Sequence, residues 1–393
     1  MSRRRSSKPS TTDVAAVEAV VDLGAIAHNV GVVGERARSG VMAVVKADGY
    51  GHGATQVARA ALAAGAAEIG VATVDEALAL RRDGVSAPIV AWLHTPTTDF
   101  AAAVAAGVEV VVSSVRQLSA VASAAESVGT TATIGVKVDT GLGRGGAAMP
   151  EWAQLCDGIA KCVASGSVAM RTAMTHLARG DEPDHPLNTR QAAHLDDCVA
   201  DLRRAGTPAQ VVHVSNSAAA LTRPDLSRDL VRAGIAIYGR TPVPHLGDFG
   251  LAPAMTLTAE ISLVKKISAG QGVSYNHTWI APRDTTIAVV ACGYADGIPR
   301  VLSGGFAVVI GGRRFPSAGR ICMDQFVVDL GPGSTDVTEG DRAVLFGSGA
   351  CGEETAADWA RAAGTIDYEI LTGIRGRAAR CYVSRPSVSR QAS

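Results

Sequence analysis

The stretch GVMAVVKADGYGHGATQVARAALAAG, residues 40–65, contains the structural unit that decides the fold. Its first six residues, GVMAVV, carry no polar side chain and include three Val, which predicts a short buried strand. The glycine-rich segment that follows predicts a turn, and residues 54–64 carry Ala and Leu at helical spacing before a closing glycine. Lys46 therefore stands at the end of an expected strand, where the apolar run gives way to the turn.

The same unit of strand, turn and helix recurs until about residue 240. Seven further Val- or Ile-rich runs follow, and they read EIGVATV, PIVAWLH, VEVVVSS, TATIGVKVD, SVAMRTAMTHLA, AQVVHVS and DLVRAGIAIYG. Amphipathic Ala- and Leu-rich stretches separate them, which gives the strand count of a (β/α)8 barrel. The runs lack clean apolar and polar alternation, as expected for parallel strands that are buried on both faces. The sequence therefore predicts an α/β fold that begins with a TIM-type barrel.

The pattern changes after about residue 250. Runs such as TTIAVVACGYADG, FAVVIGGRRF and ICMDQFVVDLG are β-branched and are cut by Gly, Pro and Asp turns, which predicts a mainly β second domain. A single helix is expected at TAADWARAAG. We expect a barrel over residues 16–245 and the β domain over 246–383, because the Pro- and Gly-rich segment PVPHLGDFGLAP lies between them. Residues 1–15 and 384–393 are Ser- and Arg-rich and predict disordered tails.

Composition limits the classes of function. Lys plus Arg equals Asp plus Glu at 37 each, so no excess charge favours a nucleic acid or an anionic membrane as partner. The seven cysteines lack the spacing of a zinc site, and we expect no metal. Their pattern is typical of reduced thiols in a cytoplasmic protein. A small-molecule enzyme fits these features best.

Reactive side chains gather at the carboxyl ends of the predicted strands, where barrel enzymes build their active sites. Lys46 follows the first strand, and the other rim positions are His94, Lys137, Asp139, His176 and Ser215 to Ser217. The loops after the last two strands of such a barrel often bind phosphate through backbone N–H groups and hydroxyls. Ser217 with Gly234 and Ile235 suits that role, and Tyr50 could add a phenolic donor.

Eight motifs in order make the chain similar to a known family. They read VVKADGYGHG, KVDTGLGRGG, MTHLA, SNSAAAL, VRAGIAIYG, GYADGIPR, GRICMDQ and DYE, and they extend over residues 16–382. The chain resembles the alanine racemases, which join a barrel to a β domain and bind pyridoxal 5'-phosphate. One departure is Asp48-Gly49, where the family usually has Asn-Ala, and it concerns the conformation of the first loop. The resemblance implies an isomerase that interconverts L-alanine and D-alanine, the latter a peptidoglycan precursor, by two-base proton transfer.

The resemblance also implies a role for the lysine of the opening stretch. Lys46 matches the residue that forms the Schiff base with the cofactor and then acts as one base, which requires an amine of lowered pKa. Tyr294 matches the second base on the opposite face. A phenol with an ordinary pKa of about 10 is a poor base without cations nearby, and the resemblance implies His176 and Arg232 as those neighbours.

Further cofactor contacts come from the same resemblance. Arg232 matches the partner of the pyridine nitrogen, to which a guanidinium can only donate. Arg144 matches a contact of the cofactor phenolic oxygen and the substrate carboxylate. Lys137 matches a lysine that is carbamylated in many family members and holds that arginine. The remaining cofactor residues implied are Tyr50, His176, Asn216, Ser217, Gly234, Ile235 and Tyr368.

The second domain adds substrate contacts and a partner. Met323 and Asp324 match residues that reach the substrate from the other subunit of a homodimer, and Arg300 lies on the same expected access path. Two other functions remain open at this stage, a pyridoxal-phosphate carrier without activity and a decarboxylase of the same cofactor fold. Carriers lack the second domain, and the decarboxylases place a carboxylate where this chain has Arg232. A barrel enzyme for another phosphate would leave Lys46 and Tyr294 unexplained, whereas alanine and serine stay equally open as substrates.

Overall fold

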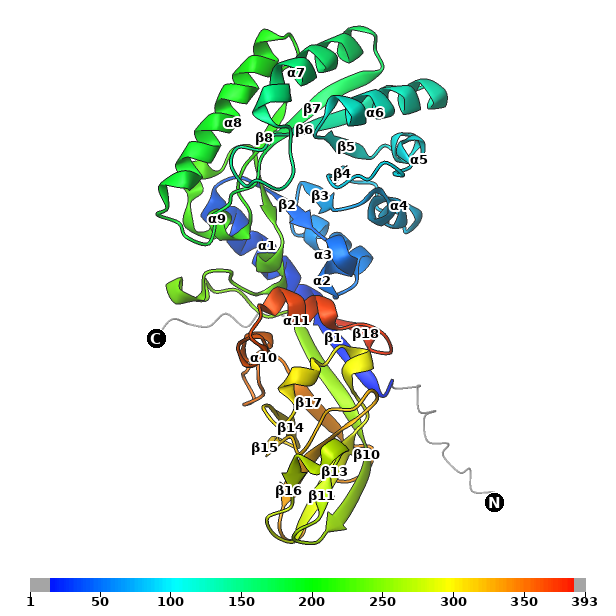
Figure 1. Cartoon of the computed structure of the whole chain (residues 1–393), viewed down its shortest axis with the longest axis vertical. Coiled ribbons are helices and arrows are strands. Elements are labelled where there is room, and N and C mark those ends of the chain that lie inside the picture. Colours follow the sequence, from blue (N-terminus) through cyan, green and yellow to red (C-terminus); the bar gives the residue numbers. More distant parts are fainter. Residues whose placement is uncertain (1–14, 385–393) are drawn as a thin grey trace, which may run out of the picture. The chain divides into compact units, whose positions relative to one another are not determined.

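The computed structural model describes residues 15–384, which divide into two compact units. The expected tails, 1–15 and 384–393, lie outside the described residues except for residues 15 and 384. One unit comprises Val21–Ala254 and the chain end from Tyr382 onward. The other comprises Met255–Cys381 together with the N-terminal segment up to Val20 (Figure 1). We call them the barrel unit and the β unit.

Eight parallel strands form the first unit. They are β2 (Gly40–Val44), β3 (Glu68–Val71), β4 (Ile89–Ala91), β5 (Glu109–Val112), β6 (Ala132–Lys137), β7 (Val168–Met174), β8 (Val211–His213) and β9 (Leu230–Ala233). The sheet runs in the order β8-β7-β6-β5-β4-β3-β2-β9. Its two end strands meet through backbone bonds, from Asp229 N–H to Val212 O at 3.1 Å and from Arg232 N–H to Ser215 O at 2.9 Å. The barrel predicted from eight repeated runs is confirmed, strand by strand.

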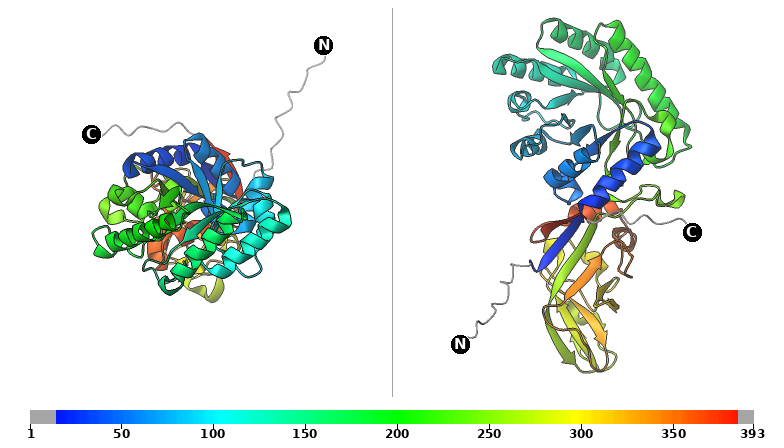
Figure 2. Two further views of the ribbon diagram at one scale, coloured as in Figure 1. Left: turned by 90° about the horizontal axis from the view of Figure 1, so that it is seen from above. Right: turned by 180° about the vertical axis from the view of Figure 1, so that it is seen from behind.

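Helices surround these strands on the outside, as both views of Figure 2 show. They are α1 (Leu23–Ala37), α2 (Lys46–Tyr50), α3 (Ala54–Ala63), α4 (Val74–Arg82), α5 (Phe100–Ala105), α6 (Val115–Val128), α7 (Met149–Ala164), α8 (Pro186–Arg204) and α9 (Ser217–Thr222). Short 3-10 turns η1 (Pro224–Leu226), η2 (Ile235–Tyr238) and η3 (Pro244–Leu246) follow. Helix α6 illustrates why they pack: it buries Leu118, Val121, Ala122 and Ala125, which recur at three- and four-residue spacing along one face.

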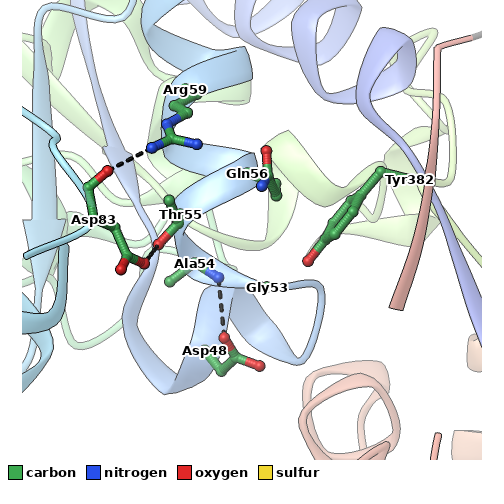
Figure 3. A pocket seen from close by; sticks show the side chains of 8 residues that line it. All are labelled: Asp48, Gly53, Ala54, Thr55, Gln56, Arg59, Asp83 and Tyr382. Carbon is green, nitrogen blue, oxygen red and sulfur yellow. Dashed lines mark hydrogen bonds between the residues drawn. The ribbon is translucent and has the colours of Figure 1, made fainter. Parts of the chain in front are cut away.

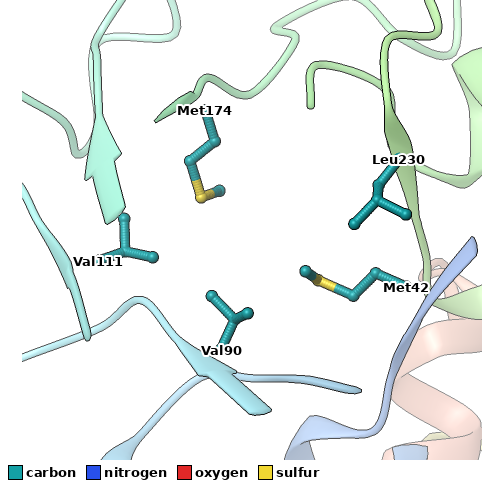
Figure 4. Close-up of a cluster of buried hydrophobic side chains, with 5 residues drawn as sticks. All are labelled: Met42, Val90, Val111, Met174 and Leu230. Atoms are coloured by element: carbon teal, nitrogen blue, oxygen red, sulfur yellow. The ribbon is translucent and has the colours of Figure 1, made fainter. Parts of the chain in front are cut away.

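The barrel interior is filled with side chains, so the barrel is a packed core rather than a channel. Five strands each contribute one buried apolar residue to a central cluster (Figure 4), namely Met42, Val90, Val111, Met174 and Leu230. Burying each such side chain contributes about 1.5 to 3 kcal/mol relative to leaving it in water. The cluster therefore holds the strand ends at fixed positions, which a site at the rim requires.

A buried ion cluster lies near the amino ends of the barrel strands. Arg171 on β7 pairs with Glu68 and with Glu109, the first residues of β3 and β5, the second at 2.5 Å. These two ion pairs tie three strands together. Since barrel chemistry is carried by the opposite rim, we assign this cluster a structural role.

The second unit is built mainly from strands. They are β1 (Val17–Asp22), β10 (Met255–Ile267), β11 (Gly272–Val273), β12 (Trp279–Ile280), β13 (Thr285–Val290), β14 (Ala307–Ile310), β15 (Arg313–Pro316), β16 (Phe326–Gly331), β17 (Arg342–Phe346) and β18 (Ala379–Val383). One sheet has the order β15-β14-β17-β10-β1-β18, with β13 joining β10 to β16, and β11 pairs with β12 separately.

Two helices and three 3-10 turns complete this unit. They are α10 (Ala356–Ala363), α11 (Asp367–Gly373), η4 (Tyr275–His277), η5 (Tyr294–Asp296) and η6 (Arg300–Leu302). The helix expected at TAADWARAAG is confirmed as α10. The sequence reading missed α11, which begins at the DYE motif without a side-chain cap. The mainly β character of the second domain is confirmed.

Candidate active site

Lys46 begins a left-handed turn directly after β2. The four residues that follow it have φ angles between 52° and 61°, and three of them are not glycine. A left-handed conformation costs about 1 to 2 kcal/mol for each residue with a Cβ atom. Backbone bonds hold the turn, from Gly49 N–H to Val45 O at 2.8 Å and from Gly51 N–H to Ala47 O at 3.0 Å. Strain of this kind is stored at functional sites and persists only where the surroundings enforce it.

Glu76 supplies part of that enforcement. Its Oε1 accepts from Ala47 N–H at 2.7 Å, while Oε2 accepts from Ala72 N–H at 2.8 Å and from Thr73 N–H at 3.2 Å. One carboxylate thus joins the residue after Lys46 to the start of α4. The sequence reading did not find Glu76, although Thr73 and Glu76 have the spacing of a helix capping box and form one.

Asp48-Gly49, the departure from the family pattern, suits the turn. Asp48 Oδ1 accepts from Ala54 N–H at 3.0 Å at the start of α3. Gly49 has a φ of 61°, and a Cβ there would lie 3.2 Å from both the backbone N and the Cα of Ala54. Glycine therefore fits this position with less strain than alanine would. The loop conformation is thus defined, and its chemistry is unaffected.

Arg232 occupies the centre of the rim and is 5% exposed. Its Nη1 group donates to His213 Nδ1 at 2.8 Å and to His213 O at 2.9 Å. Its Nη2 group donates to Thr175 O at 2.6 Å and to Val214 O at 2.9 Å, with His176 Nδ1 at 3.3 Å. Burial lowers the pKa of Arg232 to about 9, so the guanidinium remains charged at neutral pH.

His176 lies beside Arg232 in surroundings that favour its neutral form. Burial, followed by the charges of Arg232, Lys137 and Arg144, lowers the pKa of His176 to about 3. Because a guanidinium can only donate, His176 Nδ1 is the acceptor toward Arg232, which places the proton of a neutral ring on Nε2.

Asp139 shapes the loop that carries Arg144. Its Oδ1 accepts from three successive backbone N–H groups, Gly141 at 3.0 Å, Leu142 at 3.0 Å and Gly143 at 3.1 Å. These bonds lower the pKa of Asp139 against the opposing effect of its partial burial. The base of the loop is closed by Ala147 N–H, which donates to Lys137 O at 2.7 Å. The loop is therefore fixed at both ends.

Lys46, Lys137, Arg144 and Arg232 form one group of interacting charges. Burial lowers the pKa of Lys46, and Arg144 and Arg232 lower it further, while Glu76 opposes them. Burial lowers the pKa of Lys137 to about 8, with Arg232 and Arg144 adding to the effect and Asp139 opposing it. The lowered pKa expected for a lysine nucleophile is confirmed at Lys46. We call these four residues with His176 the rim cluster.

The phosphate-site residues lie at the start of α9 and η2. Asn216 Oδ1 caps α9 by accepting from Ala219 N–H at 3.1 Å. Ser217 Oγ accepts from Gly234 N–H at 2.9 Å and from Ala236 N–H at 3.3 Å, which leaves its hydroxyl proton for a ligand.

Tyr50 packs closely against the backbone of Gly234. A Cβ atom on Gly234 would lie 2.3 Å from Tyr50 Oη, so a side chain there would displace the phenol. Burial raises the pKa of Tyr50 above its ordinary value, and it therefore stays a phenol that can donate. The ring stacks on Tyr238 with centroids 4.7 Å apart. Ile235 follows as the first residue of η2 and is buried.

Tyr294, Met323 and Asp324 lie together in the β unit, and we call them the tyrosine cluster. The backbone N–H of Tyr294 donates to Cys322 O at 3.1 Å, and that of Ala295 donates to Met323 O at 3.0 Å. Tyr294 is 41% exposed and Met323 is 53% exposed. Backbone bonds thus hold Tyr294 and Met323, while their side chains are exposed.

Asp296 and Arg377, which the sequence reading missed, brace this cluster. Asp296 is fully buried and accepts from Gly293 N–H at 2.9 Å and from Arg377 Nε at 2.9 Å. Arg377 also donates to Asp324 at 2.8 Å. Asp296 lies within GYADG, so its position next to Tyr294 was visible, but its arginine partner 81 residues later was not. Tyr368 lies on α11, half-buried, and Arg300 begins η6.

His52 and His94, unassigned on the rim, have structural surroundings. His52 is fully buried, its Nδ1 lies 2.9 Å from Tyr50 O, and its ring lies 4.6 Å from that of Tyr238. Burial lowers the pKa of His94 to about 4, and its ring packs edge-on against Phe100 at 5.3 Å. Both rings therefore pack against an aromatic side chain.

A pocket of about 410 Å³ lies next to Asp48 of the left-handed turn. It is lined by Asp48, Gly53, Ala54, Thr55, Gln56, Arg59, Asp83 and Tyr382 (Figure 3). Thr55 and Arg59 both donate to Asp83, so these polar groups are directed at one another. Lys46 is not among the lining residues. The reactive residues therefore do not open into this pocket.

Residues 15–384 contain no group of three or more His, Cys, Asp or Glu side chains placed to hold a metal ion. Within the same range, every helix is too short or too polar to span a lipid bilayer.

Known proteins match the chain over nearly its whole length. Residues 21–242 match the family model for the alanine racemase N-terminal domain, and residues 254–382 match that for the C-terminal domain. The alanine racemase of Mycolicibacterium vanbaalenii is 58% identical over 366 residues, which cover 93% of this chain and 94% of that protein. That of Mycobacterium ulcerans is 55% identical over 97% of this chain and 98% of its own length.

A solved structure gives the same answer for the fold. The alanine racemase of Streptomyces lavendulae superposes with a TM-score of 0.91 at 45% identity, over 95% of this chain and 98% of that one. Matches of this extent exclude the two alternatives left open by the sequence, a carrier without activity and a decarboxylase. The chain therefore belongs to the alanine racemase family and is a pyridoxal-phosphate-dependent isomerase that interconverts L-alanine and D-alanine.

Proposed function

We propose that Lys46 and Tyr294 are the two bases of this racemase and that they act on opposite faces of the substrate. Bound pyridoxal phosphate supplies an electron sink that acidifies the Cα proton of alanine. One base removes that proton and the other returns a proton from the opposite side. A single base would return it mainly to the side from which it came, so inversion requires both.

The observation that carries this proposal is the position of Lys46, which directly follows β2 and is largely buried near Arg144 and Arg232. Burial and the neighbouring Arg144 and Arg232 all favour the neutral amine, and a neutral amine is what bonds to the cofactor aldehyde and accepts a proton. Arg144 and Arg232 suit a ligand that carries a phosphate and a phenolic oxygen. Tyr50 Oη packs against Gly234, whose N–H donates to Ser217 Oγ, so the two hydroxyls lie next to the same glycine. The residues present therefore fit the cofactor.

We assign the contacts of the cofactor ring to the hydrogen-bond donors that are not already used within the protein. Both Nη groups of Arg232 donate to protein acceptors, so its Nε–H, which has no hydrogen bond among the described residues, is the donor for the pyridine nitrogen. Ser217, Asn216, Gly234, Ile235, Tyr50 and Tyr368 would hold the phosphate. Arg144 would meet the phenolic oxygen and the substrate carboxylate, and His176 lies beside Arg232 as a neutral wall of the ring site.

Lys137 is proposed to carry a carbamate. With a pKa of about 8, a substantial part of its amine is neutral near neutral pH and can react with carbon dioxide. An ammonium beside Arg144 and Arg232 is repelled, whereas a carbamate is attracted. Its Nζ lies 3.7 Å from the position of a Cβ on Gly145, next to Arg144 in the chain. The modified side chain would hold that arginine in place.

The partner subunit is proposed to complete each site. Tyr294 and Met323 are exposed on the β unit, although a base and a substrate contact must be shielded from water when they act. A homodimer in which the tyrosine cluster covers the rim cluster of the other subunit would provide that shielding. Met323 and Asp324 would then contact alanine, and leucine or phenylalanine should react much more slowly than alanine.

Localisation is proposed to be cytoplasmic. All seven cysteines are free thiols, which is typical of a reducing compartment. Cell fractionation with antibody detection would test this.

Borohydride reduction tests the central assignment. The purified holoenzyme should absorb in the visible range, and reduction should fix the cofactor on the peptide that contains Lys46. The Lys137→Ala variant is the matched control, because it removes the other rim lysine and should still be labelled at Lys46. Labelling of Lys137 in the wild type, or a protein that takes up no cofactor, would contradict the assignment.

A further inference from the structure

Gln191 on α8 is a buried amide that no part of the proposed reaction uses. It is fully buried, and its side chain reaches from the outer helix to the ends of β6 and β7. Its Oε1 accepts from Ala178 N–H at 2.8 Å, and its Nε2 donates to His176 O at 3.0 Å and to Thr140 Oγ1 at 3.3 Å. An N–H and a carbonyl as partners leave one possible orientation of the amide.

A chain of hydroxyls continues from Gln191 through the rim. Thr140 Oγ1 and Thr175 Oγ1 lie 2.7 Å apart, and Thr175 Oγ1 donates to Val138 O at 2.9 Å. Because the Thr175 hydroxyl donates its only proton to that carbonyl, Thr140 must donate to Thr175 and accept from Gln191. Each hydrogen bond in this network therefore has one defined donor and one defined acceptor.

This network joins three parts of the rim cluster. Thr140 lies at the start of the loop that carries Arg144, His176 O is held by Gln191 itself, and Thr175 O accepts from Arg232. A methionine at position 191 would fill the same volume but would leave Ala178 N–H and His176 O without that partner. Unpaired buried groups of this kind are costly and would be relieved by movement of the strand ends.

We infer that Gln191 is a positioning residue of the racemase: it sets the spacing between the Arg144 loop, His176 and Arg232, and so the fit of the rim to the cofactor and the substrate carboxylate. The inference rests on the proposed roles of Arg144 and Arg232. It adds a residue from an outer helix that contacts neither cofactor nor substrate.

Asn188 provides a matched control on the same helix. It is 1% exposed, and its Nδ2 donates to Arg179 O at 2.8 Å and to Glu182 O at 2.9 Å. Those bonds hold the loop before α8 and do not reach the rim cluster. Gln191→Met and Asn188→Leu each replace a buried amide by an apolar side chain of similar size, and both should lower the melting temperature.

The two variants should differ in what they do to the site. In Gln191→Met holoenzyme we expect a shifted visible absorption maximum, a cofactor dissociation constant raised at least about tenfold, and a raised KM for alanine. Backbone amides of residues 139–147 should exchange hydrogen faster in the apoprotein. In Asn188→Leu all four should match the wild type. Equal values for both variants would overturn the inference and leave Gln191 a structural residue.

A second pair of variants keeps the test decisive if Gln191→Met does not fold. Thr140→Val removes the hydroxyl that accepts from Gln191, and Thr140→Ser retains it. We expect Thr140→Val to reproduce the spectral shift and the faster exchange, and Thr140→Ser to restore wild-type values. Wild-type behaviour of Thr140→Val would reject the network. Failure of the borohydride label at Lys46 in the wild type would instead reject the proposed function, so the two failures are distinct.

Discussion

The rim cluster and the tyrosine cluster place reactive side chains in opposite ways. Arg232 and Lys137 are 5% and 8% exposed, and Arg232 meets its acceptors inside the barrel unit. Tyr294 and Met323 are 41% and 53% exposed, and only their backbone is tied down. The rim cluster is therefore enclosed by its own unit, whereas the tyrosine cluster leaves the side chains of Tyr294 and Met323 exposed.

This difference in burial determines which side chains have their pKa shifted by their surroundings. Inside the barrel, desolvation and neighbouring cations lower the pKa of Lys46, Lys137 and His176 together. These charge states are properties of the fold and should persist in the apoprotein. In the proposed dimer, the tyrosine cluster would acquire its working environment when the partner subunit covers it. Changes in the rim should thus alter cofactor binding, and changes in the tyrosine cluster should alter proton transfer.

The largest expected effect is that of Tyr294→Phe. Removing one of two bases should lower the racemisation rate by about 10² to 10⁴-fold, the usual range for a general base. Cofactor binding should be unchanged, because the rim cluster is intact. In deuterated water, one enantiomer of alanine should still exchange its α proton through Lys46, and the other should not.

Tyr275→Phe is the control for this change. Tyr275 lies on η4 of the same unit and is 64% exposed, but it is not part of the tyrosine cluster. Its loss should leave the rate unchanged. If Tyr294→Phe racemised alanine at the wild-type rate, Tyr294 would not be one of the two bases, and the contrast between the two clusters would have no catalytic meaning.

Bicarbonate dependence should show the next largest effect. If the pKa of Lys137 is about 8, the neutral fraction of its amine rises about tenfold between pH 7 and pH 9. Reactivation of dialysed enzyme at constant dissolved carbon dioxide should accelerate by the same factor. A lysine of ordinary pKa would give about a hundredfold acceleration over this range. No reactivation at all, in enzyme that is active while unmodified, would contradict the carbamate.

Much of the rim could be predicted from the sequence, because each rim residue follows an apolar run whose end is visible. Lys46, Lys137, His176 and Ser217 were found in this way. Glu76 and Gln191 were not, since both lie on outer helices, where a polar residue is usually solvated. Glu76 acts on Ala47, which is 29 residues away in the chain, and Gln191 acts on His176, which is 15 residues away. No local sequence pattern indicates such contacts.

Glu76→Gln should have an intermediate effect. The change removes the one negative charge that raises the pKa of Lys46, so that pKa should fall further. Capture of pyridoxal phosphate by the apoprotein, followed by absorbance, should then reach its half-maximal rate at lower pH. A weakened bond to Ala47 should also lower the free energy of unfolding by about 1 to 2 kcal/mol.

Glu126→Gln on the exposed face of α6 is the matched control for that change. It should alter the free energy of unfolding by less than about 0.5 kcal/mol and leave cofactor capture as in the wild type. An unshifted pH profile in Glu76→Gln would mean that the Glu76 carboxylate does not influence the pKa of Lys46.

The smallest expected effect separates two glycines of the barrel unit. Gly49→Ala places a Cβ in the left-handed turn and should lower the free energy of unfolding by about 1 kcal/mol. Gly31→Ala lies in α1 with no heavy atom within 4 Å of the added Cβ, and it should raise the free energy of unfolding by about 0.5 to 1 kcal/mol. Urea denaturation midpoints should therefore move in opposite directions. Equal shifts would show that the turn after Lys46 is not strained.

The sequence could not reveal how the tyrosine cluster is braced. Tyr294 and Asp296 are adjacent in one motif, but Arg377 pairs with Asp296 from 81 residues away. The helix α11 was missed for a related reason, because it lacks the capping signal that marks α10. Long-range pairs and uncapped helices depend on tertiary packing, which local patterns do not encode.

Mixed dimers test the central claim, that the rim cluster of one subunit works with the tyrosine cluster of the other. Lys46→Ala and Tyr294→Phe should each be inactive alone. If the two residues act across subunits, a heterodimer of these variants holds one site with both bases and one with neither. Co-refolding should then restore activity in about half of the heterodimer sites, counted by borohydride labelling. A verified heterodimer that remains inactive would contradict the claim, because every site would still lack one base.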